Sequence, residues 1–217
     1  EAGGHDRTGL LRRASDALSR LRTLVPSFEA EIGRHATAVL ADVRTHLGDT
    51  EEATELYASL IEAGALDEAY VARASMGMLD HGRPQLALDA LARSSRDDTL
   101  AQGLLARAHA AIGDLKASKS ALSQGEALLA EAPTRQEVIA MSLAALTVGD
   151  GQAASRILGL TSESDVRLEV LRARCERLLG NHDGATDHYY AALSSAESED
   201  NVGVRLEFAQ HLYISGN

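Results

Sequence analysis

The fold is decided by a recurring stretch of sequence, seen most clearly in residues 142–158, which read SLAALTVGDGQAASRIL. A turn glycine, Gly149, stands in its middle. Small residues lie seven positions before the glycine (Ser142) and five after it (Ala154), and the large Leu158 lies nine after it. A helix that stops and reverses commonly ends in a left-handed residue, and the aspartate that follows the glycine is suited to capping the next helix. The stretch therefore predicts two antiparallel helices that approach closely at their small residues.

The same pattern recurs along the chain. Turn glycines stand at Gly48, Gly82, Gly113, Gly149, Gly180 and Gly216, which are 34, 31, 36, 31 and 36 residues apart. The small positions hold Ala41, Ser75, Ala106, Ser142, Ala173 and Ala209 before the glycines, and Ala53, Ala87, Ser118, Ala154 and Ala185 after them. The large positions hold Tyr57, Leu91, Leu122, Leu158 and Tyr189. Because the small positions are all Ala or Ser and the period suits a helix pair, we predict a tandem array of helix hairpins.

This small, glycine, small, large pattern resembles the tetratricopeptide-repeat (TPR) family, whose unit is two antiparallel helices in about 34 residues. The resemblance covers roughly residues 28–217. It implies an all-α fold, namely a right-handed α-solenoid of stacked antiparallel helix pairs. About five complete repeats would be joined by a leading helix and a terminal half-repeat.

We expect one TPR-like domain over residues 1–217. Its parts are a leading helix at about 7–24, repeats at about 28–63, 66–95, 97–131, 134–159 and 163–197, and a half-repeat at 200–215. Two helix starts carry the cap-x-x-acid spacing, at Asp49 with Glu52 and at Thr134 with Glu137. The chain ends where the second helix of a sixth pair would begin, so we expect a fragment of a longer protein and an uncovered apolar face on helix 200–215.

Composition narrows the classes of partner. The formal net charge is −11, from 32 acidic and 21 basic side chains, which disfavours nucleic acid. The single cysteine, Cys175, allows neither an intramolecular disulfide nor a cysteine zinc site. No run approaches the ~18 to 20 apolar residues of a membrane span. We therefore expect a soluble cytoplasmic protein, with the periplasm as the alternative if an N-terminal signal has been removed.

The sequence shows no phosphate-binding glycine loop, nucleophile elbow or zinc-protease helix motif. His182 and His188 are six residues apart, which does not place them on one helical face, so we interpret them as solvated surface residues. Cys175 is interpreted as a buried or half-buried spectator, Tyr189 as a filler between helices and Tyr190 as half exposed. We expect no enzyme, no catalytic residue, no metal and no cofactor.

A candidate groove follows from equal offsets before the turn glycines, because the first helices of successive pairs line the concave face of such solenoids. Six residues before the third to fifth glycines stand Arg107, Leu143 and Arg174, and related offsets give Ile139, Leu146 and Arg177. We predict a two-part site in which the arginines hold carboxylates or phosphate while the aliphatic residues take an apolar side chain. The alternative is that acids on neighbouring helices neutralise the arginines, or that the arginine stems cover apolar surface.

The leading functional prediction is a protein–protein interaction scaffold that binds a peptide or partner helix in this groove, with a ligand of mixed apolar and acidic character. A first alternative is a non-catalytic recruiting arm of a larger enzyme, such as a sulfotransferase, glycosyltransferase or hydroxylase. A second is a regulatory receptor for a small molecule or signalling peptide. A homodimer through the uncapped terminal helix is a further expectation.

Overall fold

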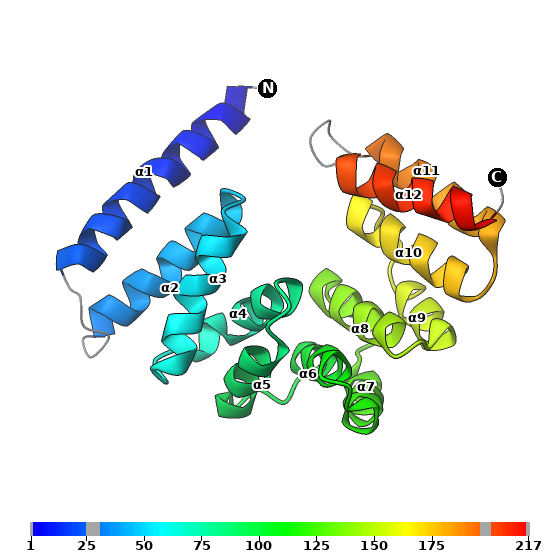
Figure 1. Ribbon diagram of the computed structural model, residues 1–217, viewed down its shortest axis with the longest axis horizontal. Helices are drawn as coiled ribbons and strands as arrows, with labels where there is room; N and C mark the ends of the chain where they lie inside the picture. The colour runs from blue at the N-terminus through cyan, green and yellow to red at the C-terminus, as the bar shows by residue number, and fades with distance from the viewer. Residues whose placement is uncertain (1, 25–30, 196–200, 216–217) are drawn as a thin grey trace. The chain divides into compact units, whose positions relative to one another are not determined.

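The computed structural model describes residues 2–24, 31–195 and 201–215, and within them the chain forms α-helices joined by turns, without a strand (Figure 1). The chain divides into two compact units, Glu1–Asp97 and Asp98–Asn217. The helices of the first unit are α1 (Ala2–Leu24), α2 (Glu31–His46), α3 (Thr50–Glu62), α4 (Glu68–Asp80) and α5 (Pro84–Arg93). Those of the second are α6 (Thr99–Ala111), α7 (Leu115–Leu128), α8 (Arg135–Thr147), α9 (Gly151–Leu158), α10 (Val166–Leu178), α11 (His182–Ser195) and α12 (Asn201–Ser215).

The turn glycines end the first helix of each pair as the sequence predicts. Their φ angles are left-handed: 83° at Gly48, 68° at Gly82, 84° at Gly113, 78° at Gly149 and 80° at Gly180. At Gly149 the reversal lets the Asp150 amide donate to the Ala145 carbonyl at 2.9 Å, which satisfies an otherwise free helix-end acceptor. Gly216, the sixth predicted turn glycine, lies outside the described residues.

Both helices start where the capping signals predict, but the side-chain cap bond forms at only one of them. Thr134 and Glu137 form a full capping box at the start of α8. Asp49 makes no side-chain cap bond at the start of α3, because its carboxylate accepts from Arg44 Nη1 at 2.9 Å instead. The helix start predicted at Asp49 is therefore confirmed, whereas the side-chain cap bond predicted there is wrong.

The small and large repeat positions form the core. Ten of the eleven small residues are buried, and so are the five large ones. The exception is Ala209 on α12, which is exposed. In the second unit the two helices of each pair contact one another, and the first helices α6, α8 and α10 also contact in sequence. The fold class is confirmed as an all-α solenoid of TPR-like helix pairs.

Within the second unit, α6 and α8 approach closely at Gly103. A Cβ atom added there would lie 3.1 Å from the Ala140 carbonyl carbon and 3.2 Å from the Met141 nitrogen. The backbones of two successive first helices thus meet so closely that a side chain at residue 103 would require one of them to shift. This close contact fixes α8, whose C-terminal half borders the pocket described below. None of the helices in the described ranges has both the length and the apolar character that crossing a membrane requires.

Candidate functional site

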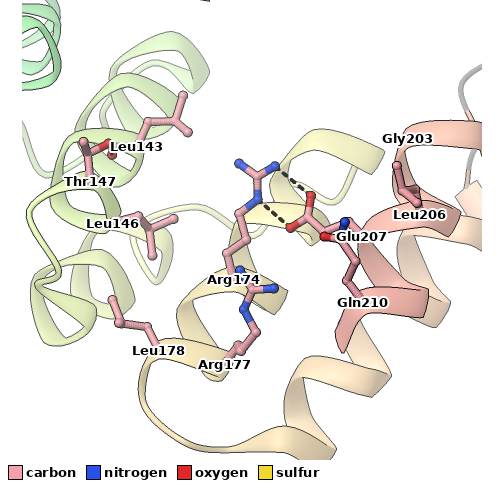
Figure 2. A pocket seen from close by; sticks show the side chains of 10 residues that line it. All are labelled: Leu143, Leu146, Thr147, Arg174, Arg177, Leu178, Gly203, Leu206, Glu207 and Gln210. Atoms are coloured by element: carbon pink, nitrogen blue, oxygen red, sulfur yellow. Dashed lines mark hydrogen bonds and ion pairs between the residues drawn. The ribbon is translucent and has the colours of Figure 1, made fainter. Parts of the chain in front are cut away.

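A pocket of about 720 Å³ lies between α8, α10 and α12 of the second unit (Figure 2). Its lining comes from Leu143, Leu146, Thr147, Arg174, Arg177, Leu178, Gly203, Leu206, Glu207 and Gln210. Leucines of α8 form one wall and polar side chains of α12 form much of the other, with the two arginines of α10 between them (Figure 2). The pocket is therefore built from the first helices of two successive pairs and from α12.

An ion pair crosses the pocket from α10 to α12. Arg174 Nε donates to Glu207 Oε1 at 2.7 Å, and Arg174 Nη2 donates to Oε2 at 2.7 Å. The Tyr189 hydroxyl of α11 also donates to Oε1, at 2.9 Å. Tyr189 is fully buried and stacks on Phe208 with ring centroids 5.3 Å apart. Two parallel hydrogen bonds to one carboxylate give this pair a defined geometry.

The pKa shifts indicate that both members of the pair are ionised. The hydrogen bond to Glu207 raises the pKa of Arg174, against the opposing effect of burial. Burial acts to raise the pKa of Glu207, but the hydrogen bond and charge of Arg174, with the Tyr189 donor, outweigh it and leave the pKa below its ordinary value. Burial, followed by the nearby Glu207 charge, raises the pKa of Tyr189, which stays a neutral donor. The pair is thus internally neutralised.

Arg177 lies one turn further along α10 and is partly buried. It makes no hydrogen bond or ion pair with another described residue, although its charge contributes to lowering the pKa of Glu207. The pocket lining therefore contains two arginines and one carboxylate, which leaves one positive charge. This local charge is opposite in sign to the net charge of −11 of the chain.

Four of the six predicted groove residues meet at the pocket: Leu143, Leu146, Arg174 and Arg177. Ile139 does not, because only 4% of it is exposed and it belongs to the core around α8. Arg107 lies on α6, does not line the pocket and has interactions of its own. For Arg174 the structure supports the alternative raised from the sequence, namely neutralisation by an acid on a neighbouring helix.

Sequence reasoning missed Glu207, although a second repeat offset could have found it. In the first unit the Arg73 guanidinium donates to Asp42, which also accepts from the Tyr57 hydroxyl. Tyr57 and Tyr189 occupy the same repeat position, nine residues after a turn glycine. Asp42 and Arg174 lie six residues before their glycines, and Arg73 and Glu207 lie nine before. Each unit therefore contains a cluster of one acid, one arginine and one tyrosine. The acid lies six residues before its glycine in the first unit and nine before in the second, and the arginine takes the other position.

The cysteine, tyrosine and histidine that the sequence analysis discussed do not line the pocket. Cys175 is buried, its thiol donates to the Gly151 carbonyl at 3.3 Å, and burial raises the pKa of that thiol. Tyr190 is 57% exposed, in line with the prediction. His188 is not merely solvated as predicted, because its Nδ1 lies 2.7 Å from Glu169 Oε2.

Glu169 is itself buried and also accepts from Ser164 and Arg172. Burial acts to raise its pKa, but the hydrogen bonds from His188, Ser164 and Arg172 outweigh burial and lower it. The carboxylate therefore ties the loop before α10 to α10 and α11. In the part of the chain that the structure covers, no three His, Cys, Asp or Glu side chains are placed to hold a metal ion.

The stacked hairpins and the pocket between first helices are the architecture of a TPR fold, and solved structures agree. A tetratricopeptide repeat protein from Parabacteroides merdae matches with a TM-score of 0.68 at 14% identity, over 95% of this chain and 80% of that one. A thermophilic TPR protein from Thermus thermophilus matches with a TM-score of 0.65 at 19% identity, over 83% of this chain and 99% of that one. No family model and no curated protein matches the sequence. The similarity is therefore one of fold, and the fold is TPR-like.

Proposed function

We propose that this protein is an interaction module that binds a peptide or partner helix of another protein in the pocket of the second unit. TPR-like folds serve in general as protein-interaction scaffolds, because stacked hairpins create an extended surface that no single hairpin has. The observation that carries the proposal is the pocket between α8, α10 and α12, where leucines and an arginine without a protein partner among the described residues face one space.

The size and chemistry of the pocket support a peptide ligand. A volume of about 720 Å³ lies within the range of about 300–1,000 Å³ that ligand sites occupy. Leu178 and Leu206 are 46% and 62% exposed, so they offer apolar surface that a partner would remove from water. Gln210 adds an amide that can pair with a peptide backbone.

Selection of peptides from a random displayed library tests the proposal. We expect the selected peptides to bind wild-type protein and to bind Leu206→Ser about tenfold more weakly, because the exposed leucine loses part of a contact worth ~1.5–3 kcal/mol on full burial. Leu115→Ser on α7 is the matched control, because Leu115 is similarly exposed (54% against 62% for Leu206) in the same unit and lies outside the pocket. Equal loss in both variants, or none in either, would place binding elsewhere.

A homodimer is a second candidate, favoured by the exposed face of α12. Val202 and Tyr213 are 73% and 87% exposed, and with Leu206 and Ala209 they follow the four, three, four spacing of helices that pair along a seam. Two copies of α12 would cover each other's apolar stripe. Sedimentation velocity over a range of concentrations measures this directly, and a constant monomer would remove the homodimer from consideration.

A further inference from the structure

The charges of the pocket limit which ligand it accepts. Arg174 uses Nε and Nη2 on the two oxygens of Glu207, so this edge of its guanidinium is occupied, while Nη1 has no hydrogen bond to another residue drawn in Figure 2. Releasing Arg174 to a ligand would leave Glu207 without its guanidinium partner while only 18% of the Glu207 side chain is exposed. An unpaired carboxylate in that position is costly, because it loses its partner without regaining full hydration. The charge of Arg174 is therefore balanced by Glu207, and only its Nη1 group is left to donate to a ligand.

A phosphate group fits this arrangement poorly. Tight phosphate binding usually needs several donors that converge on one group, often two arginines. Because Glu207 balances the charge of Arg174, the pocket lining keeps one positive charge, and the Glu207 carboxylate on α12 would repel a doubly charged anion. A single carboxylate carries less charge and needs only one guanidinium.

Arg177 is the residue placed to hold that carboxylate. It faces the pocket between Leu178 of its own helix and Gln210 of α12 (Figure 2). Because it has no hydrogen-bond or ion-pair partner among the described residues, a ligand carboxylate can bind it without breaking a protein contact. Its guanidinium can also form two parallel hydrogen bonds with a carboxylate.

The leucines define the second half of the ligand. Leu143 and Leu146 of α8 stand on one side of the arginines and Leu206 of α12 stands on the other. An aliphatic side chain beside the bound carboxylate would reach Leu143 and Leu146 and lose its own contact with water. A ligand with a carboxylate alone would leave the leucines uncovered, and a purely apolar ligand would bury the Arg177 charge without a partner.

We infer that the pocket binds a peptide segment in which one Asp or Glu lies beside an aliphatic side chain, with the carboxylate on Arg177, the aliphatic group against Leu143 and Leu146, and a flanking residue of the segment against Leu206. This inference rests on the proposed function, since it specifies the ligand of the same pocket. It excludes phosphopeptides as the preferred ligand.

The experiment compares the sequences and affinities of peptides selected on the wild-type protein. We expect the selected peptides to be enriched in an acidic residue within one helical turn of Leu, Ile, Val or Met. Arg177→Glu should weaken their binding at least about tenfold, because a charge-assisted contact becomes a repulsion. A peptide with Lys in place of the acidic residue should bind Arg177→Glu better than wild type, which isolates the pair in a double-mutant cycle.

Arg205→Glu is the matched control, because Arg205 is exposed on α12 and lies outside the pocket lining. It makes the same change in net charge and should leave binding within about twofold, as expected for an exposed charge away from the contact. Circular dichroism and thermal melts of both variants check that the fold is intact.

Three results would overturn the inference, and they separate it from the proposed function. Peptides that lose binding with Leu206→Ser but show no acidic preference and tolerate Arg177→Glu would refute the inference and leave the interaction pocket standing. Tighter binding of a peptide when its serine is phosphorylated beside the same aliphatic residue would refute it in favour of a phosphate ligand. Absence of any peptide whose binding depends on Leu206 would refute both.

Discussion

At the scale of single residues, the wall of the pocket depends on one carboxylate that serves two neighbours. Glu207 accepts two hydrogen bonds from Arg174 and one from Tyr189. These bonds join α10, α11 and α12, which belong to successive parts of the repeat. The carboxylate is therefore both a neutralising partner and a connection between helices.

Exchanging the two charges tests this connection. We expect Arg174→Ala to destabilise the second unit by about 1–2 kcal/mol, since the pair is only partly exposed and Glu207 is left without its cation. The double variant Arg174→Glu with Glu207→Arg should recover most of that loss. We expect this because the first unit already contains the pair in the exchanged orientation, with Asp42 and Arg73 beside Tyr57.

Urea unfolding followed by circular dichroism measures these differences, with Arg205→Ala as the control for removing an arginine from the same unit. A double variant as unstable as the sum of its single changes would show that the orientation of the pair, and not only its presence, is fixed by the surroundings.

The sequence predicted residues whose role is local and failed where the partner is distant. Gly149 was predictable because the conformation at a helix end depends on the residue itself. The partner of Arg174 was not, because Glu207 is 33 residues away and a search along one helix cannot find it. The pair of Arg73 and Asp42 shows how the partner could have been found: the residue nine before one turn glycine pairs with the residue six before the preceding turn glycine.

At the scale of helices, α8 explains why the groove prediction was only partly realised. Its residues between Val138 and Ala145 are mostly buried, so α8 is apolar on nearly every side. A helix of that kind gives no amphipathic contrast from which to decide which side faces the pocket. Equal offsets placed Ile139 and Leu143 on one surface, whereas the structure buries Ile139 in the core and leaves Leu143 at the pocket.

The close contact of α6 with α8 leads us to expect that replacing a helical glycine by alanine lowers the stability there, whereas this replacement usually raises it. In an open helix interior, Gly→Ala stabilises by roughly 0.5–1 kcal/mol, because glycine loses more backbone freedom on folding. At Gly103 we expect Gly103→Ala to destabilise the second unit by about 1–3 kcal/mol instead, because the new Cβ atom meets the backbone of Ala140 and Met141, which cannot move without shifting α8.

The matched control is Gly203→Ala on α12, where an added Cβ atom has no neighbour within 4 Å and the change should stabilise. Thermal unfolding by differential scanning calorimetry compares the two variants. Stabilisation at both positions would mean that α6 and α8 separate easily, and the pocket wall formed by α8 would then be less rigid than the close contact implies.

At the scale of the whole molecule, the net charge of the pocket lining is opposite in sign to the net charge of the chain. The chain carries a formal net charge of −11, while the ionised side chains that line the pocket leave one positive charge. The field of the whole protein acts on a ligand during its approach, and the arginine acts on it at contact. An acidic peptide is therefore repelled at long range and attracted at short range.

Salt distinguishes these two effects, because ions screen interactions beyond a Debye length of about 10 Å at 0.1 M ionic strength much more than contacts inside a pocket. For a selected acidic peptide we expect the association rate constant to increase with added salt, as the repulsion from the net charge is screened. The dissociation rate constant should also increase, by a smaller factor, as the contact with Arg177 weakens.

Stopped-flow fluorescence with a labelled peptide measures both rate constants. The control is the same peptide with Lys in place of its acidic residue and a net positive charge, whose association with the acidic chain should slow as salt is added. An association rate constant that falls with salt for the acidic peptide would mean that the positive charge of the pocket already governs the approach. The net charge of the chain would then have no part in selecting the ligand.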